Sequence, residues 1–397
     1  MSNNTNLSKK SVFAALLLIS ASSRAATFTT LYDFTGKPGD GAQPMGDLVV
    51  AEGQLFGVTS AGGRGCGKNG CGTVFTVNPS TGAEQVLHQF DNNATQIANG
   101  IMPTFGLAAF GHRLIGLTSA GGAGNGTIFS VDPASGHVRT IGDFLSIGAA
   151  STSLTKYKSA LYGATYNGGN NPSCPIAGGC GTVYRLDPKT GAVTIIYSFG
   201  GSADGTAPSG SLLLAGHLLY GSTEGGAQDD ASTLFSVDPA TGAHSVLYVF
   251  PPNPLKGEIP GGDLAYDRNA IYGTTAFGGD KTCKSQDCGV VYRFDLARMK
   301  FTVVHRFGIA DGQRPMGGLL LSGGMLYGTA PYGGAAGCGD VFEVDPVSRA
   351  FTVVEDFSGT PSCSPWAGLV GDGSGTLYGT TRDSTGPGEG TVFALTP

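Results

Sequence analysis

The sequence predicts an all-β protein, a seven-bladed β-propeller of four-stranded blades. Glycine supplies 67 of the 397 residues and proline 21, so turns must be frequent, while 40% hydrophobic residues suffice for a core. A five-residue motif of the form Leu-Tyr-Gly-Thr-Thr recurs seven times, at intervals of 47 to 59 residues. A segment that belongs to the end of the repeat unit stands instead near the start of the chain, which indicates that the repeats close into a ring.

Each repeat divides into four short segments that are typical of β-strands, rich in β-branched and aromatic residues and bounded by Gly, Pro, Asn and Asp. We name them A, B, C and D in chain order; in the first repeat they are residues 44–48, 55–59, 72–75 and 86–90. Strand A usually opens with Pro and Gly, strand B is the recurring motif, strand C reads Gly-Thr-Val-Phe, and strand D alternates before a terminal Phe. The seven B strands are expected at 55–59, 114–118, 161–165, 219–223, 271–275, 326–330 and 377–381.

Strand D decides between an open stack and a ring. Six of the seven repeats are followed by a D strand, because the chain ends at Pro397 soon after the seventh strand C. Residues 28–34 match the D strands 301–307 and 351–357 position by position. A linear β-solenoid, the alternative, gives no reason for such a split, whereas a propeller is closed when its first strand completes the last blade.

The connections between strands differ in length, and this separates two faces of the disc. C-to-D turns such as 187–191 read Asp-Pro-x-Thr-Gly, in which Pro presets the first dihedral and Gly accepts a positive φ. A-to-B turns are equally short, whereas B-to-C connections such as 60–71 and D-to-A connections such as 35–43 are long. In an antiparallel blade both long kinds emerge on one face, so we expect function on this long-loop face.

The first 25 residues are expected to be a signal peptide. Lys9 and Lys10 precede an apolar run at 12–19, and small residues follow. A buried N-terminal helix is the alternative, and the run is shorter than the ~20 residues that span a bilayer. We therefore predict a mature protein of residues 26–397, a single propeller domain without a membrane span, secreted to the periplasm or the extracellular space.

Charge is low and evenly spread along the chain. Charged residues make up 13% of the sequence, and the net charge is -6. Binding to a phosphate backbone depends on an excess of Lys and Arg. We therefore expect no nucleic-acid partner.

Cysteines fall in the long connections and group by loop. The expected pairs are Cys66 with Cys71, Cys174 with Cys180, Cys283 with Cys288, and Cys338 with Cys363. An even number in an exported chain favours four disulfides. Zinc is the alternative, but its ligands must cluster and each of these pairs belongs to a different loop or junction. We expect neither a metal nor a cofactor.

The residues that could perform acid–base chemistry give little evidence of a catalytic site. The histidines fall in the short turns or in D strands, which argues against a histidine-dependent site on the long-loop face. Glycosidase chemistry needs two carboxyls roughly 5–9.5 Å apart, and the carboxylates expected on that face are Glu224, Asp229, Asp230, Asp280, Asp287, Asp311 and Glu389. Asp40, Asp204 and Asp311 each precede Gly in D-to-A connections and are expected to form turns rather than to bind Ca²⁺.

Aromatic and arginine side chains on the long-loop face are the better candidates, because they stack on sugar rings or pair with carboxylates. Trp366 is the single tryptophan and stands where the last strand A opens. Packing over the last blade is the alternative role for it. The candidate binding residues are Arg64, Tyr166, Glu224, Phe277, Tyr332, Trp366 and Arg382, with Arg314 as a third arginine of the same face.

The whole pattern, from Leu-Tyr-Gly-Thr-Thr through Gly-Gly to Gly-Thr-Val-Phe, Asp-Pro-x-Thr-Gly and the Phe-ended strand, resembles the GloVer tandem repeat of secreted bacterial "choice-of-anchor" proteins. The match covers nearly the whole mature chain. The resemblance implies an extracellular repeat protein without an assigned activity. No sorting motif or hydrophobic tail follows the last strand, which favours free secretion over surface anchoring.

Together these features predict a secreted monomer that binds an extracellular carbohydrate or protein on its long-loop face and has no catalytic activity. Two alternatives remain open at this stage. One is a polysaccharide lyase or hydrolase with its site at the channel mouth, and the other is a purely structural envelope protein. The fold by itself does not choose among them.

Overall fold

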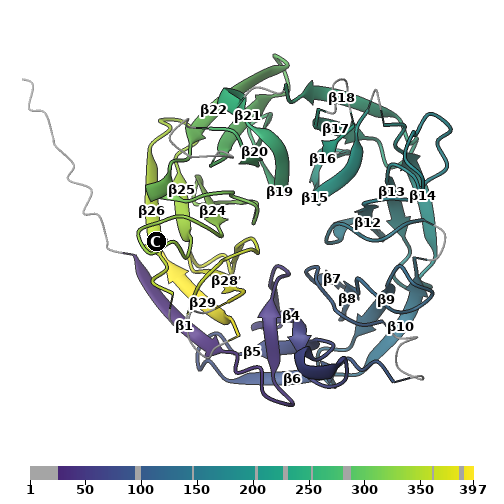
Figure 1. Ribbon diagram of the computed structural model, residues 1–397, viewed down its shortest axis with the longest axis vertical. Coiled ribbons are helices and arrows are strands. Elements are labelled where there is room, and N and C mark those ends of the chain that lie inside the picture. Colours follow the sequence, from purple (N-terminus) through teal and green to yellow (C-terminus); the bar gives the residue numbers. More distant parts are fainter. Residues whose placement is uncertain are drawn as a thin grey trace, which may run out of the picture.

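The computed structural model describes residues 26–93, 100–144, 147–201, 204–226, 231–251, 254–279, 288–359, 362–383 and 389–397. These residues form seven antiparallel sheets arranged as a ring around a central axis (Figure 1). The predicted seven-bladed β-propeller is confirmed. The predicted signal peptide, residues 1–25, and the candidates Asp229, Asp230, Asp280 and Asp287 lie outside the described residues.

In each blade the strands follow one another from the axis to the rim. Blade 1 holds β2 (Gly41–Pro44), β3 (Val49–Ala51), β4 (Gln54–Gly62), β5 (Thr73–Val77) and β6 (Glu84–Gln89). Blade 2 holds β7 (Ala108–Phe110), β8 (Arg113–Leu117), β9 (Thr127–Val131) and β10 (Val138–Asp143). Blade 3 holds β11 (Thr155–Tyr157), β12 (Ala160–Thr165), β13 (Thr182–Leu186) and β14 (Val193–Ser198).

Blade 4 holds β15 (Thr206–Ala215), β16 (Leu218–Gly225), β17 (Thr233–Val237) and β18 (His244–Val249). Blade 5 holds β19 (Glu258–Asp267), β20 (Ala270–Phe277), β21 (Val290–Asp295) and β22 (Lys300–Arg306). Blade 6 holds β23 (Leu319–Ser322), β24 (Met325–Ala330), β25 (Asp340–Val344) and β26 (Phe351–Asp356). Blade 7 holds β27 (Val370–Gly371), β28 (Leu377–Thr381), β29 (Thr391–Thr396) and, from the other end of the chain, β1 (Thr27–Asp33).

Strand β1 closes the ring, as the displaced D strand predicts. It pairs antiparallel with β29, from Thr27 opposite Thr396 to Asp33 opposite Thr391. Figure 1 shows purple β1 beside yellow β29 on the rim of blade 7. A linear solenoid is therefore excluded, because the first strand and the last belong to one sheet.

An aromatic pair at every junction between blades explains two of the recurring motifs, the Phe that ends strand D and the aromatic residue of strand C. The Phe that follows each outer strand packs on the aromatic side chain of the next blade's strand C, with ring centroids 5.0 to 5.6 Å apart. Such contacts contribute beyond the burial of their area. The pairs are Phe34–Phe75, Phe90–Phe129, Phe144–Tyr184, Phe199–Phe235, Phe250–Tyr292, Phe307–Phe342 and Phe357–Phe393.

The glycine in the strand B motif lies directly against these rings. A Cβ at Gly57 would stand 2.5 Å from the Phe75 ring, and one at Gly116 would stand 2.2 Å from the Phe129 ring. Real Cβ atoms do not approach so closely, so each blade needs glycine here for the aromatic ring to fit.

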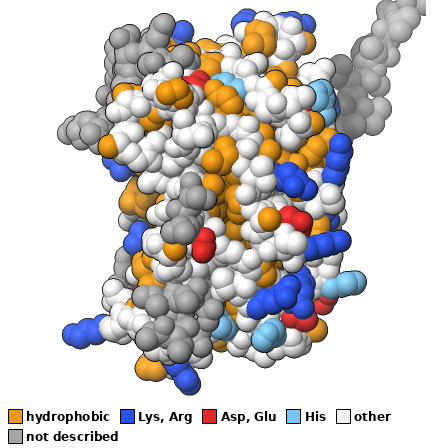
Figure 2. Space-filling view, turned by 90° about the vertical axis from the view of Figure 1, so that its right-hand side faces the viewer, with side chains coloured by type: hydrophobic (Ala, Val, Ile, Leu, Met, Phe, Trp, Pro, Cys, Tyr) orange, Lys and Arg blue, Asp and Glu red, His pale blue; other side chains and the backbone are white. Residues whose placement is uncertain are grey.

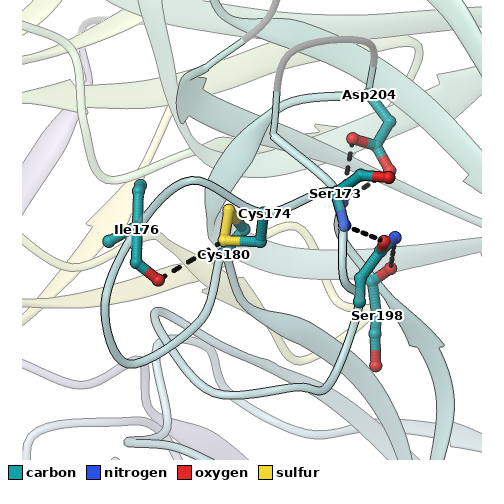
Figure 3. Close-up of a disulfide and its surroundings, with 8 residues drawn as sticks. Ser173, Cys174, Ile176, Cys180, Ser198 and Asp204 are labelled. Carbon is teal, nitrogen blue, oxygen red and sulfur yellow. Dashed lines mark hydrogen bonds between the residues drawn. A yellow bond between two sulfur atoms is a disulfide. The ribbon is translucent and has the colours of Figure 1, made fainter.

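Three predicted disulfides are present: Cys66–Cys71, Cys174–Cys180 and Cys338–Cys363. Figure 3 shows the second of them closing a B-to-C loop of blade 3. Cys288 is also disulfide-bonded, and its predicted partner Cys283 lies outside the described residues. Disulfides persist in oxidising compartments, which indicates a non-cytoplasmic protein.

The surface in Figure 2, seen from the edge of the disc, is mostly uncharged, and several of its Lys and Arg side chains gather toward the right-hand part of the view. Within the described ranges, no helix is both long enough and apolar enough to cross a membrane. The same ranges contain no group of three or more His, Cys, Asp or Glu side chains arranged to hold a metal ion.

Candidate binding site

The inner ends of the seven blades meet around the axis and enclose a narrow channel. On its long-loop side lies a cavity of about 250 Å³, whose lining includes Glu224 and Trp366. A second cavity of about 300 Å³ lies beside leucines of the inner strands, such as Leu154 and Leu212. Asp47 and Asp263 line both cavities and therefore stand at the narrow part of the channel.

Asp47 and Asp263 form an acidic pair that spans the axis. Asp47 Oδ1 accepts a hydrogen bond from Gly368 N at 2.6 Å, and Asp263 Oδ1 accepts one from Ser211 N at 2.8 Å. Burial, followed by the charge of the nearby Asp263 carboxyl, raises the pKa of Asp47 well above its usual range. The two backbone hydrogen bonds join blade 1 to blade 7 and blade 4 to blade 5 at the centre of the ring.

Sequence reasoning missed this pair, although the repeats contain its signal. The position that precedes the Leu of strand A lies on the axis in every blade. It is small in five blades and acidic in two, namely Asp47, Gly106, Ser153, Ser211, Asp263, Gly318 and Gly368. Alignment of the seven A strands would have identified the two exceptions.

Four of the candidate binding residues, joined by Arg314, form one contiguous row across blades 5 to 7. The Arg314 guanidinium lies 4.9 Å from the ring centroid of Phe277 and 5.8 Å from that of Tyr332. Tyr332 meets Trp366 edge-on at 5.6 Å, and Arg382 lies 5.8 Å from the Trp366 ring. Cation–π and aromatic contacts of this kind stabilise the row. We call these five residues the aromatic–arginine ladder.

Backbone geometry that recurs around the ring positions Arg314. It has φ +55° and precedes Pro315, and the residue before Pro in blades 1, 2, 4, 5 and 7 also has a positive φ, of 53 to 60°. A positive φ is uncommon outside glycine and costs free energy, so the surrounding structure must hold it. The equivalent residues are Gln43, Met102, Ala207, Ile259 and Ser364.

The disulfide cysteines hold four of these strained residues in place. Their carbonyl oxygens accept hydrogen bonds from the next blade, with N–H···O pairs Met102–Cys71 at 2.8 Å, Ala207–Cys180 at 3.0 Å, Arg314–Cys288 at 3.0 Å and Ser364–Cys338 at 2.8 Å. Each bond thus joins a crosslinked residue of one blade to the entry of the next blade's inner segment. The disulfides therefore support the channel mouth as well as stiffening their loops.

Cys363 extends this support to the end of the ladder. Its N–H donates to Asp383 O at 2.8 Å, and Asp383 N donates back to Cys363 O at 3.1 Å. Arg382 N donates to Ser364 O at 3.0 Å. The Cys338–Cys363 crosslink thus fixes the two loops of blade 7 that carry Trp366 and Arg382.

The other predicted binding residues have no ring, cation–π or ion-pair contact with the ladder within the described part of the chain. Glu224 shares the loop-side cavity with Trp366, and burial raises the pKa of its carboxyl. Tyr166 and Arg64 are exposed on blades 3 and 1, and among the described residues neither makes a ring or ion-pair contact with the ladder. The structure therefore brings together one group of the candidates and separates the rest.

The aspartates that precede glycine form turns, as predicted. Asp40 accepts from Thr35 N at 2.7 Å, and Asp204 accepts from Gly200 N at 3.0 Å (Figure 3). Asp311 accepts from Gly308 N and lies 2.8 Å from His305 Nε2 through Oδ2. Because these carboxylates are bonded within their own loops, they serve the scaffold.

Fold and site together define a disulfide-stabilised repeat propeller with a row of aromatic and arginine side chains on its long-loop face. Three overlapping regions, residues 17–177, 67–285 and 232–397, match the Gloeobacter/Verrucomicrobia repeat. The chain belongs to this repeat family, which confirms the predicted resemblance. A search of curated proteins found no match.

Solved structures share the fold at low sequence identity. A chain of the mitotic checkpoint complex is 14% identical, covers 98% of both chains and has a TM-score of 0.58. An oligogalacturonate lyase in complex with manganese is 11% identical, with 94% and 96% coverage and a TM-score of 0.55. A 6-phosphogluconolactonase candidate from Bacteroides fragilis is 17% identical, with 84% and 89% coverage and a TM-score of 0.55. At this identity the likeness concerns the fold alone, and these neighbours include both enzymes and a member of a protein assembly.

Proposed function

We propose that this protein is a secreted, non-enzymatic propeller that binds an extracellular carbohydrate or protein through its long-loop face. In this proposal residues 1–25 are a cleaved signal peptide, and residues 26–397 act as a monomeric single domain. The observation that carries the proposal is the aromatic–arginine ladder, because it presents three aromatic rings and two guanidinium groups from three blades on one face.

The acidic pair on the axis does not support glycoside hydrolysis. The two carboxyls of a glycosidase flank a bound substrate, whereas Asp47 and Asp263 line a cavity of about 250 Å³, smaller than the ~300–1,000 Å³ pockets that enclose small ligands. The Asp47 and Asp263 oxygens are also bonded to backbone N–H groups of neighbouring blades. A structural role across the ring accounts for both contacts.

Binding to a panel of soluble polysaccharides and peptides, measured by calorimetry, tests the proposal. We expect at least one saturable ligand, and we expect Trp366→Ala to weaken it about tenfold or more, as loss of a central aromatic contact does. Tyr166→Ala, an exposed aromatic of the same face outside the ladder, is the matched control and should bind normally. Unchanged affinity in Trp366→Ala would remove the ladder from the site. New reducing ends, or an unsaturated product that absorbs in the ultraviolet, would instead support a lyase or hydrolase.

A further inference from the structure

The ladder alternates two kinds of group that suit one kind of ligand. Its aromatic rings offer apolar faces, on which the C–H face of a sugar ring packs. Its arginines offer planar forks of N–H donors, which match carboxylates. Resting on the proposed function, we propose that the ladder binds a carboxylated polysaccharide, whose sugar rings lie on Phe277, Tyr332 and Trp366 and whose carboxylates meet Arg314 and Arg382.

The size of the channel mouth favours a polymer on the surface over a small molecule inside. The loop-side cavity measures about 250 Å³, below the ~300–1,000 Å³ of pockets that enclose small ligands. The ladder instead runs across three blades in steps of 4.9 to 5.8 Å between neighbouring groups. A chain with a ring and a carboxylate in each unit meets several of these groups at once.

The carboxyls near the ladder do not neutralise Arg382 by hydrogen bonding. Arg382 Nε has no hydrogen-bond partner among the described residues, and the nearest ion-pair oxygen, Asp383 Oδ1, is 3.8 Å away. That distance exceeds hydrogen-bond length. Asp311 is bonded to His305 and Gly308, so its charge is held within its own turn.

The channel keeps an acidic polymer on the surface. Asp47, Asp263 and Glu224 line the same cavity as Trp366, and burying a further carboxylate beside them costs free energy that no Lys or Arg of this lining offsets. This arrangement selects a ligand that lies across blades 5 to 7 rather than one that inserts along the axis.

Calorimetric titration of the full chain with alginate, dextran and poly-L-glutamate tests the ligand class. We expect alginate to bind, dextran to bind at least tenfold more weakly, and the affinity for alginate to fall as salt rises. The double variant Arg314→Gln/Arg382→Gln should lower the affinity for alginate at least tenfold. The control variant Arg64→Gln, which changes an exposed arginine outside the ladder, should leave that affinity unchanged. Glutamine suits position 314 because Gln43 occupies the same positive-φ position in blade 1, and equal thermal midpoints of variant and parent confirm folding.

The outcomes separate this inference from the proposed function. If dextran and alginate bind with equal affinity, or if the arginine variant binds alginate like the parent, the ligand is not a carboxylated polysaccharide. The proposed function still stands in that case, provided that binding depends on Trp366. If poly-L-glutamate is the one polymer that binds tightly, the ligand is an acidic protein and not a polysaccharide. Binding that persists unchanged in Trp366→Ala removes the ladder from the site and overturns this inference, whereas the absence of any saturable ligand overturns the proposed function. Fluorescence of Trp366, the single tryptophan, reports in the parent whether the polymer lies on the ladder.

Discussion

Blades 1 and 6 follow one backbone plan but differ where strands B and C end. In blade 1, Thr59 Oγ1 and Thr73 Oγ1 share a hydrogen bond of 2.8 Å. In blade 6 the same two positions are Ala330 and Asp340, and the buried Asp340 carboxyl has no hydrogen-bond partner among the described residues. Burial and then the charges of Asp356 and Asp311 raise its pKa to about 8.

The two blades differ in the same way at the channel mouth. Ser60 Oγ donates to Gln43 O at 3.0 Å in blade 1, so this corner satisfies its own polar groups. In blade 6 the corresponding corner carries Arg314 and Tyr332, which belong to the ladder. The repeat therefore fixes the backbone, while the side chains at the strand ends decide whether a blade contributes to the aromatic–arginine ladder.

The largest expected effect concerns the disulfides. The bridge of blade 1 spans 5 residues, and the bridge that joins blades 6 and 7 spans 25. Loop-closure entropy predicts that Cys338→Ser/Cys363→Ser lowers the free energy of unfolding by about 3.5 kcal/mol and Cys66→Ser/Cys71→Ser by about 2 kcal/mol. Denaturant unfolding without reductant measures both. Equal losses, or unchanged ligand binding in Cys338→Ser/Cys363→Ser, would contradict the special role of the second bridge.

A second substitution makes blade 6 resemble blade 1. Ala330→Thr/Asp340→Thr should raise the free energy of unfolding at pH 8 by about 2 kcal/mol, because it replaces an unpartnered buried carboxyl with a hydrogen-bonded pair. The folded-state pKa of Asp340, about 8, exceeds the unfolded value near 3.9. The stability of the parent should therefore fall as pH rises from about 4 to 8, and the variant should lack this component. Unfolding curves at pH 5 and pH 8 measure the gain, and a gain that does not grow with pH would refute the assignment.

A third substitution, Tyr332→Ala, removes one aromatic ring of the ladder. It introduces the residue that blade 1 has at the equivalent position, Ala61. Tyr332→Ala should weaken alginate binding about tenfold, the effect of losing roughly 1.4 kcal/mol of aromatic contact. The midpoint of unfolding should stay close to that of the parent, since Tyr332 is partly exposed. An affinity equal to the parent's would show that the Tyr332 ring does not contact the ligand.

The smallest expected effect lies in blade 1. Ser60→Ala removes the hydrogen bond to Gln43 O and should lower the free energy of unfolding by about 1 kcal/mol or less. Ligand affinity should not change, because this corner lies outside the ladder. A loss of binding comparable to that of Tyr332→Ala would extend the recognition surface around the whole channel mouth.

Short motifs in the sequence were enough to predict the blades, the ring closure and three disulfides, Cys66–Cys71, Cys174–Cys180 and Cys338–Cys363. Residues 28–34 identify the closing strand because they match other D strands, and cysteines five to six residues apart can meet within one loop. The candidate residues were harder to rank. Phe277 and Tyr166 satisfy the same sequence criteria, yet only Phe277 contacts the ladder, because contact depends on which blades are neighbours at the mouth.

The sequence by itself determined the number of blades, the order of strands and the face with long loops, because each follows from local periodicity and turn chemistry. Only the tertiary structure decided which side chains share a surface. Closing the ring brings Asp47 against Asp263, which are far apart in the chain, and aligns residues of three blades into the ladder. Such contacts depend on the geometry of the closed ring, which no single repeat encodes.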